Sequence, residues 1–132
     1  QMSELVRDLG QYLMDQLVVQ GFGEDLFLNF EPDDPNDVVI LTEYAGSNST
    51  PIGVLLRRVQ VKVRGVEYEN ALQKIWSVYN SFIKDDKEFI IHLTDRYLIP
   101  TALQVPIRLM VDDKGRHVFV FNLSFTTTKD FN

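Results

Sequence analysis

The sequence predicts an α+β fold in which two helices pack on one face of a predominantly antiparallel (mixed) sheet of about five to six strands. Two stretches carry apolar residues at spacings of three and four, which is the repeat of an amphipathic helix. Other stretches alternate apolar and polar residues, which is the repeat of a half-buried strand. A C-terminal β-hairpin completes the pattern. The chain has 132 residues without a linker-like segment, so we expect a single domain over residues 1–132.

The first helix is expected to begin after Ser3, a possible cap, and to end at Gly21 and Gly23. Its apolar stripe comprises Leu5, Val6, Leu9, Leu13, Leu17 and Val18. Residues 26–42 then predict a hairpin or a pair of short strands, interrupted by the turn EPDDPND at 31–37.

A long loop is expected at residues 44–53, YAGSNSTPIG, because they are small, polar and punctuated by Gly and Pro. Residues 55–64 form a regular strand with valines on one face. A second helix is expected over 67–83. Its apolar stripe comprises Tyr68, Leu72, Ile75, Tyr79 and Phe82. This aromatic-rich stripe and the valine-rich strand face can pack together.

The C-terminal hairpin is the clearest local pattern. Residues 105–111 alternate, DDKG at 112–115 supplies a turn, and residues 116–127 return. One face of the returning strand carries Phe119, Phe121, Leu123 and Phe125. Before the hairpin, residues 89–94 predict a strand, and Pro100 and Pro106 indicate irregular chain or a sheet edge.

Composition excludes several function classes. The chain contains no cysteine, which excludes disulfide scaffolds, zinc–thiolate sites and thiol catalysis. The formal net charge of −6 argues against general, charge-driven binding of nucleic acid. No apolar run approaches the ~18 residues that a transmembrane helix needs, and no signal-peptide pattern is present, so we expect a soluble protein made in a cytoplasm, without a membrane partner.

One basic stretch contrasts with the acidic chain. Residues 56–65 read LRRVQVKVRG, with four cations and no acid. Alternation places one set of candidates on the face opposite the valines: Arg58, Gln60, Lys62 and Arg64. Arg57 falls on the apolar side, at the start of the strand, from which its side chain can extend outward.

Three uses of this basic face remain open. It is a solvated edge that discourages aggregation, a surface for nucleic acid, or a head-to-tail contact with an acidic patch on a neighbouring subunit. No aromatic residue interleaves with the cations, which argues against base recognition. The acidic patch would comprise Glu31, Asp33, Asp34 and Asp37.

No motif predicts an enzyme. The chain lacks a P-loop, a G-x-G-x-x-G stretch and a G-x-S-x-G elbow, and residues 31–37 lack the ligand order of a calcium loop. His92 and His117 would have to converge through folding to act together, and we interpret them as surface or edge-strand residues. We therefore expect no catalytic residue, metal or cofactor; a hydrolase without recognisable spacing is a disfavoured alternative.

Two stretches carry a family resemblance. Residues 58–82, RVQVKVRGVEYENALQKIWSVYNSF, join a valine-alternating strand to an aromatic-rich helix. Residues 99–128, IPTALQVPIRLMVDDKGRHVFVFNLSFTTT, contain a D-x-K-G-R turn and an N-x-x-x-x-T ending. Both resemble the minor capsid or tail-terminator proteins of long-tailed phages and prophages. With the leading helix, the resemblance covers nearly the whole chain.

The resemblance implies a non-enzymatic virion assembly protein made in the host cytoplasm. Such subunits form rings, usually hexamers, on the head-proximal end of the tail tube. It implies three partners (further copies, a tail-tube protein and a head-completion protein) and non-specific passage of DNA. A head–tail connector or stopper protein is the alternative, and a small nucleic-acid-binding module is less favoured. Which strand face lines the lumen stays open.

The family's long loop, often involved in subunit or tube contacts, matches residues 44–53. The contact candidates that the resemblance implies there are Tyr44, Ser47, Asn48, Ser49 and Thr50.

Overall fold

The computed structural model describes residues 5–47, 54–84, 90–93 and 97–128. The elements in chain order are α1 (Leu5–Asp15), β1 (Leu26–Leu28), β2 (Val38–Ser47), β3 (Val54–Gly65), α2 (Tyr68–Phe82), β4 (Ile91–His92), β5 (Tyr97–Ala102), β6 (Ile107–Val111) and β7 (His117–Thr128). The predicted α+β class with two helices is confirmed.

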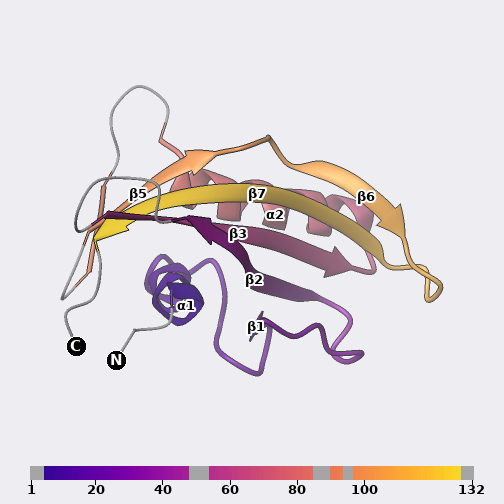
Figure 1. Ribbon diagram of the computed structural model, residues 1–132. Coiled ribbons are helices and arrows are strands. Elements are labelled where there is room, and N and C mark those ends of the chain that lie inside the picture. Colours follow the sequence, from indigo (N-terminus) through magenta and orange to yellow (C-terminus); the bar gives the residue numbers. More distant parts are fainter. Residues whose placement is uncertain (1–4, 48–53, 85–89, 94–96, 129–132) are drawn as a thin grey trace.

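The strands form one curled sheet in the order β1-β2-β3-β7-β5-β4, and β6 pairs with β7 on the side that β5 also uses. Among the strand pairs of the described residues, β1 and β2 run parallel and the others are antiparallel. Figure 1 shows β3 and β7 as the long, curved centre of the sheet. Because β3 lies between β2 and β7, the interpretation of residues 55–64 as a solvated edge strand is wrong.

Both helices pack against one face of the sheet, as predicted. Residues of α1 and α2 share a single core cluster with the inward valines of β3 and the aromatic face of β7. Tyr12 of α1 stacks on Phe82 of α2 with ring centroids 5.5 Å apart, and its hydroxyl donates to the Ser81 carbonyl at 2.7 Å. Burial in this contact raises the pKa of Tyr12. The two helices therefore stabilise each other as well as the sheet.

The first helix ends earlier than the apolar repeat predicts. Leu17 adopts a φ of 63°, and the Val18 amide donates to the Leu13 carbonyl, a pattern that closes a helix. The Leu17 side chain is 90% exposed, so it does not extend the buried stripe. No helix in the described ranges combines the length and the apolarity needed to cross a membrane.

Part of the loop expected at residues 44–53 is strand instead. Residues 44–47 belong to β2, which pairs with β3 as far as Ser47 opposite Leu56, with an irregularity between Glu43 and Ala45. Backbone pairing with β3 overrides the Gly and Ser content there. Candidates Asn48, Ser49 and Thr50 lie outside the described residues, as does part of the strand expected over 89–94.

The C-terminal hairpin forms as predicted. β6 and β7 are joined by residues 112–115, where Gly115 has a φ of 77° and its amide donates to the Asp112 carbonyl. The Asp112 carboxylate accepts the Lys114 and Arg116 amides at 3.0 and 2.9 Å. Side-chain hydrogen bonds of an aspartate within its own turn fix this connection.

Candidate functional site: the outer face and edge of the sheet

The face of β2, β3, β7 and β6 opposite the helices is called the outer face here. Alternation along β3 places the predicted basic-face residues on it: Arg58, Gln60, Lys62 and Arg64. Four neighbouring apolar side chains are buried but stand outside the main core cluster: Val38, Ile40, Val118 and Val120. The outer face therefore has a small buried layer of its own.

Residues 31–37, the acidic strap, are held against this face by Arg64. The Arg64 guanidinium donates to the carbonyls of Pro32 and Pro35, both at 2.7 Å, and to Asn36 at 3.2 Å. It also contacts a Glu31 carboxylate oxygen at 3.1 Å. Arg64 is 2% exposed. A cation deep in a strand thus satisfies several backbone carbonyls of a segment with no regular structure.

Arg116, 5% exposed, holds the strap from β7's side. Its guanidinium donates to the Asp33 carbonyl at 2.7 Å and to Asn36 Oδ1 at 3.3 Å. Its Nε donates to Asp112 Oδ2 at 2.9 Å. Lys114 in the hairpin turn pairs with the Asp33 carboxylate. The strap, the end of β3 and the β6–β7 turn therefore form one network of charges.

The pKa values of three carboxyl groups respond to this network. Burial raises the pKa of Glu31, but hydrogen bonds and charges of Lys62 and Arg64 outweigh it and lower the pKa overall. The pKa of Asp33 is lowered, mainly by its hydrogen bond from Lys114. The pKa of Asp112 is lowered, mainly by the backbone amide of Arg116. All three groups stay ionised more readily in the folded chain.

The charge pairing that the sequence suggested between subunits is made within one chain. Glu31 pairs with Lys62 at 2.9 Å and with Arg64, and Asp33 pairs with Lys114 and Arg116. The Asp37 carboxylate is also engaged, since it accepts the Val66 amide at 3.0 Å. Glu31 is the predicted acid that pairs with cations of the basic face, and it does so in the same molecule because the strap folds back over β3, whereas Asp33 pairs with cations of the hairpin.

The other half of the outer face is mostly uncharged. Thr42, Tyr44, Gln60 and Asn122 line a shallow hollow of about 260 Å³. Arg58 lies one register step further along β3, opposite Ser124, and forms no ion pair with any described carboxylate. This half offers hydrogen-bonding groups and one cation, without a row of stacking aromatics.

Arg57 lies on the helix side of β3, as alternation predicts, and does not reach the outer face. Its guanidinium makes two hydrogen bonds to the Glu43 carboxylate, at 2.7 and 2.8 Å. Its Nη1 is buried without a partner among the described residues. Arg57 therefore belongs to the packing at the end of the sheet.

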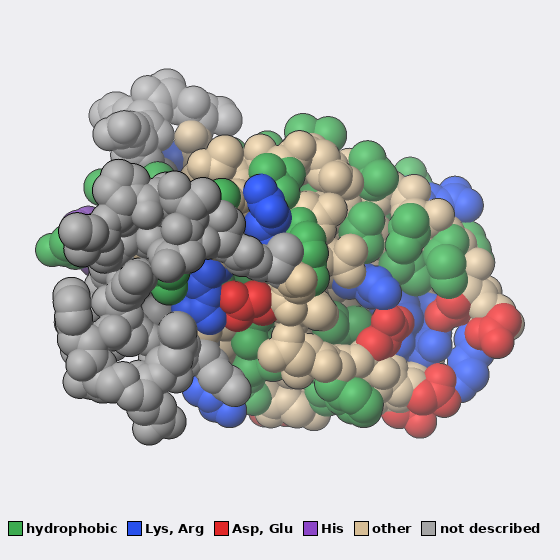
Figure 2. Space-filling model, in the orientation of Figure 1, with side chains coloured by type: hydrophobic (Ala, Val, Ile, Leu, Met, Phe, Trp, Pro, Cys, Tyr) green, Lys and Arg blue, Asp and Glu red, His purple; other side chains and the backbone are tan. Residues whose placement is uncertain are grey.

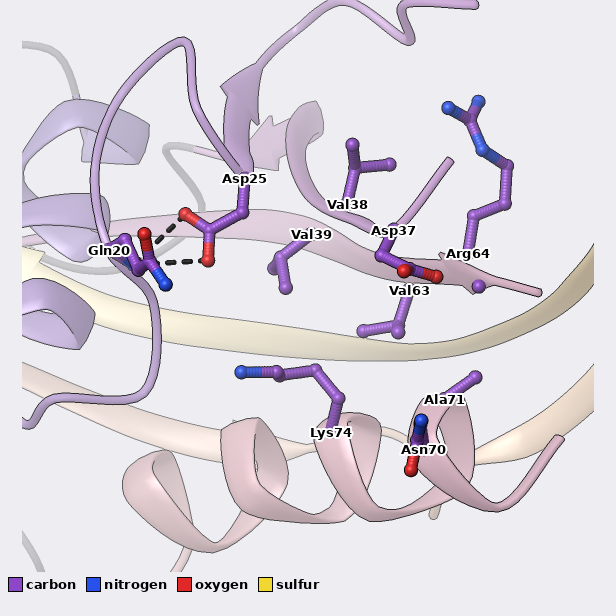
Figure 3. A pocket seen from close by; sticks show the side chains of 11 residues that line it. Gln20, Asp25, Asp37, Val38, Val39, Val63, Arg64, Asn70, Ala71 and Lys74 are labelled. Carbon is purple, nitrogen blue, oxygen red and sulfur yellow. Dashed lines mark hydrogen bonds between the residues drawn. The ribbon is translucent and has the colours of Figure 1, made fainter. Parts of the chain in front are cut away.

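A pocket of about 300 Å³ lies between α2, the start of β2 and the loop before β1 (Figure 3). Asp25 accepts the Gln20 amide at 2.9 Å, and Lys74 donates to the Val18 carbonyl at 2.6 Å. Figure 3 shows the Arg64 guanidinium pointing away from this pocket. The charged groups that line it hold loops in place, and no nucleophile–base pair is assembled there.

The two histidines do not converge. His92 in β4 lies next to the residue pair Leu98–Thr127, whereas His117 begins β7. Ten residues of strand separate the two positions, or about 30 Å at ~3.3 Å per residue. His92 packs on Tyr97 and His117 on Tyr68, with ring centroids 4.9 and 5.4 Å apart. Across the described ranges, no group of three His, Asp or Glu side chains is placed to hold a metal ion.

The edge formed by β6 is a surface that the sequence analysis missed. All five residues of β6 are exposed, although four of them are apolar. Figure 2 shows acidic and basic side chains interleaved at one end of the molecule, with hydrophobic side chains gathered along the side where β5 and β6 run. An unbroken apolar run at 109–111 was the available sequence signal, because a half-buried strand alternates.

The family model described as "Bacteriophage tail terminator protein" matches residues 13–129, which is most of the chain. The match includes both stretches on which the resemblance was based. No curated protein matches the chain significantly.

Proposed function

Because the chain belongs to the bacteriophage tail terminator family, we propose that its copies form a ring of six subunits that caps the head-proximal end of the tail tube. The ring stops addition of tube subunits and presents a surface to a head-completion protein. It acts without catalysis. Its place is the virion tail, where a tail terminator belongs.

The family match over residues 13–129 is the observation that carries this proposal. The surface supports it, because the sheet ends in an exposed apolar strand suited to assembly. An assembly protein needs a large contact surface rather than a reactive pocket.

The outer face is compatible with passing DNA as a non-specific partner. Lys62 is paired with Glu31 and Arg64 is 2% exposed, so neither is free to contact a phosphate and release counterions. Arg58 and the uncharged side chains beside it give weak phosphate contacts at most. A ring through which DNA moves needs weak contacts, because strong ones would retain the DNA.

Electron microscopy of the protein mixed with its tail-tube protein tests the proposal. We expect tubes of restricted length, each with added density at one end, and unrestricted polymers when the protein is left out. Antibody labelling of virions is expected to mark the junction of head and tail. Uncapped, indefinite tubes would contradict termination, and binding to heads but not to tubes would favour a connector or stopper protein.

A further inference from the structure

We propose that β6 of one copy pairs in antiparallel fashion with residues 42–47, the distal half of β2, in the next copy. The sheet would then continue from subunit to subunit around the ring. This proposal rests on the proposed function for the ring itself, and it specifies the surface through which the ring is made.

The first observation is that β6 is an unprotected edge. It pairs with β7 on one side, and no described strand pairs with its other side. Its five residues carry only one charge, on Arg108. Edge strands in soluble monomers are usually shortened, charged or covered, because a row of free backbone groups is a template for another strand. β6 has little such protection.

The second observation is the apolar area on this edge. Fifteen large apolar side chains in the described residues are exposed, and eight of them lie within residues 97–111. They are Tyr97, Ile99, Leu103, Val105, Ile107, Leu109, Met110 and Val111, each 41–57% exposed. At about half exposure they present on the order of 700 Å², near the ~800 Å² that one partner contributes to a standard interface.

The third observation identifies the opposite edge. β1 pairs only with Val39, Ile40 and Leu41 of β2. Asn29 adopts a φ of 56°, and its Oδ1 accepts the Glu43 amide at 3.1 Å, which ends the ladder. Beyond this point residues 42–47 pair with β3 on one side and with no described strand on the other. Tyr44 to Ser47 lie beyond the occupied Glu43 amide, and this open stretch is one residue shorter than the five-residue β6.

Strand directions make these two edges compatible. β2 and β7 both run antiparallel to β3, and β6 runs antiparallel to β7. β6 therefore runs in the direction of β3 and opposite to β2. When copies are placed side by side without inversion, β6 meets the next β2 in the antiparallel arrangement, which is the more stable one per residue.

In a closed sheet, each strand is shifted along its neighbour. This shift places β6 of one copy beside residues 42–47 of the next copy. In one chain, the row of residues through Ile107 crosses β7 and β3 and ends at Ile40. Each copy contributes four strands (β2, β3, β7 and β6), spaced ~4.8 Å apart. If these strands tilt by ~45° from the axis of the ring, the next copy is shifted along the strand direction by about 19 Å, or about six residues. Six residues beyond Ile40 is Gly46, within the open half of β2. A shift in the opposite sense would lead into the strap, which contains no strand.

Side chains at the two edges also suit each other. Tyr44, 49% exposed, lies within the open half of β2, and Leu109, 52% exposed, lies at the irregularity in β6. With Ile107 placed opposite Gly46, Leu109 falls next to Tyr44. An aromatic–aliphatic pair across strands stabilises a sheet by roughly 0.2–1 kcal/mol.

Disulfide cross-linking tests this pairing, because the chain contains no cysteine. Leu109→Cys and Tyr44→Cys variants are mixed and oxidised, alone at high concentration and in the presence of tail-tube protein. We expect a disulfide-linked dimer that needs both variants. A chain carrying both substitutions is expected to form a ladder of oligomers. Leu17→Cys mixed with Tyr44→Cys is the control, since Leu17 is 90% exposed and lies in the turn after α1.

Each outcome separates this proposal from the proposed function. Capped tubes with no more cross-linking than the Leu17→Cys control would overturn the edge pairing and leave termination intact. A ladder from a protein that caps no tube would support the pairing and reject termination, and absence of both would reject both. Efficient dimers of Leu109→Cys alone would show β6 pairing with itself, which overturns the head-to-tail arrangement. Leu109→Lys in a chain without added cysteines is expected to weaken the oligomers seen by sedimentation without changing the unfolding midpoint.

Discussion

The acidic strap and the β6 edge lie on the same sheet but differ in how their side chains are satisfied. In the strap, charges on Glu31 and Asp33 meet cations of the same chain, and two arginines are almost fully buried. At the β6 edge, apolar side chains and one side of the backbone ladder face solvent. The conspicuous charges are therefore paired within the subunit, whereas the less conspicuous apolar strand remains exposed and available for association.

The difference follows from the free energy that each kind of side chain costs when it has no partner. A guanidinium removed from water must be paired and hydrogen-bonded, so Arg64 organises the strap around itself. An exposed leucine costs far less in a monomer and is stabilised when a second surface covers it. The strap is therefore expected to govern the stability of each subunit, and the edge its association.

The largest expected effect comes from removing the cation beneath the strap. Arg64→Met leaves at least two strap carbonyls and one carboxylate oxygen of Glu31 without their donor, so we expect the free energy of unfolding to fall by about 3–5 kcal/mol. Urea unfolding of the monomer measures the change. Arg64→Lys, which keeps the charge but not the fork of donors, should fold with an intermediate loss.

Arg58→Met is the matched control for this substitution, because Arg58 lies on the same face of the same strand. It is expected to change the free energy of unfolding by no more than about 1 kcal/mol, since Arg58 has no ion pair with a described carboxylate. Equal losses for the two variants would contradict the view that the strap depends on Arg64.

Acid should weaken the strap and leave the edge unaffected. The pKa values of Glu31, Asp33 and Asp112 are lower in the folded chain than their ordinary values of 4.5, 3.8 and 3.8. Their stabilising contribution is therefore complete above the ordinary values and is lost as the pH falls through the lowered ones. Unfolding midpoints measured from neutral pH down to about pH 3 should fall most steeply below about pH 4.5. Glu31→Gln should flatten this fall, and an unchanged profile would contradict the assignment.

Much of the architecture was predictable because it depends on short-range repeats. The C-terminal hairpin followed from an alternating pattern around DDKG, and the second helix from its aromatic stripe. Parity correctly placed Arg58, Lys62 and Arg64 on one face of β3 and Arg57 on the other. The early end of α1 was not predictable, since Leu17 continues the apolar repeat but adopts a left-handed backbone conformation.

The partners of the charged residues could not be predicted from sequence. Lys62 and Glu31 are separated by 31 positions, and Lys114 and Asp33 by 81, so only the folded chain brings them together. The central position of β3 depends on β7, which pairs with it along its whole length. The sign of each charge can be read from the sequence, but whether its partner lies in the same chain or in another subunit cannot.

Salt should distinguish association through the edge from association through charges. Because the proposed contact is mainly apolar, we expect the apparent dissociation constant to change less than about threefold when sodium chloride is raised tenfold. Sodium sulfate at the same ionic strength should strengthen association, because it favours burial of apolar surface. Sedimentation at several concentrations measures both. Dissociation by sodium chloride would restore a charged contact through Arg58 or the strap.

The smallest change in stability is expected for a substitution at the exposed rim of the strap. It compares an exposed cation with a buried one within the same charged network. Lys114 pairs with Asp33, but their side chains are 51% and 66% exposed. Water competes for both groups, and ordering two long side chains offsets much of the attraction. Arg116 continues to hold the Asp33 carbonyl in Lys114→Met. Its unfolding midpoint should therefore match that of the unmodified protein within error, with Arg116→Met measured in parallel as the buried counterpart. If Lys114→Met lowered the midpoint as much as Arg116→Met, burial would not determine how much each cation stabilises the strap. The exposed ion pairs would then contribute as much to its stability as the buried arginine.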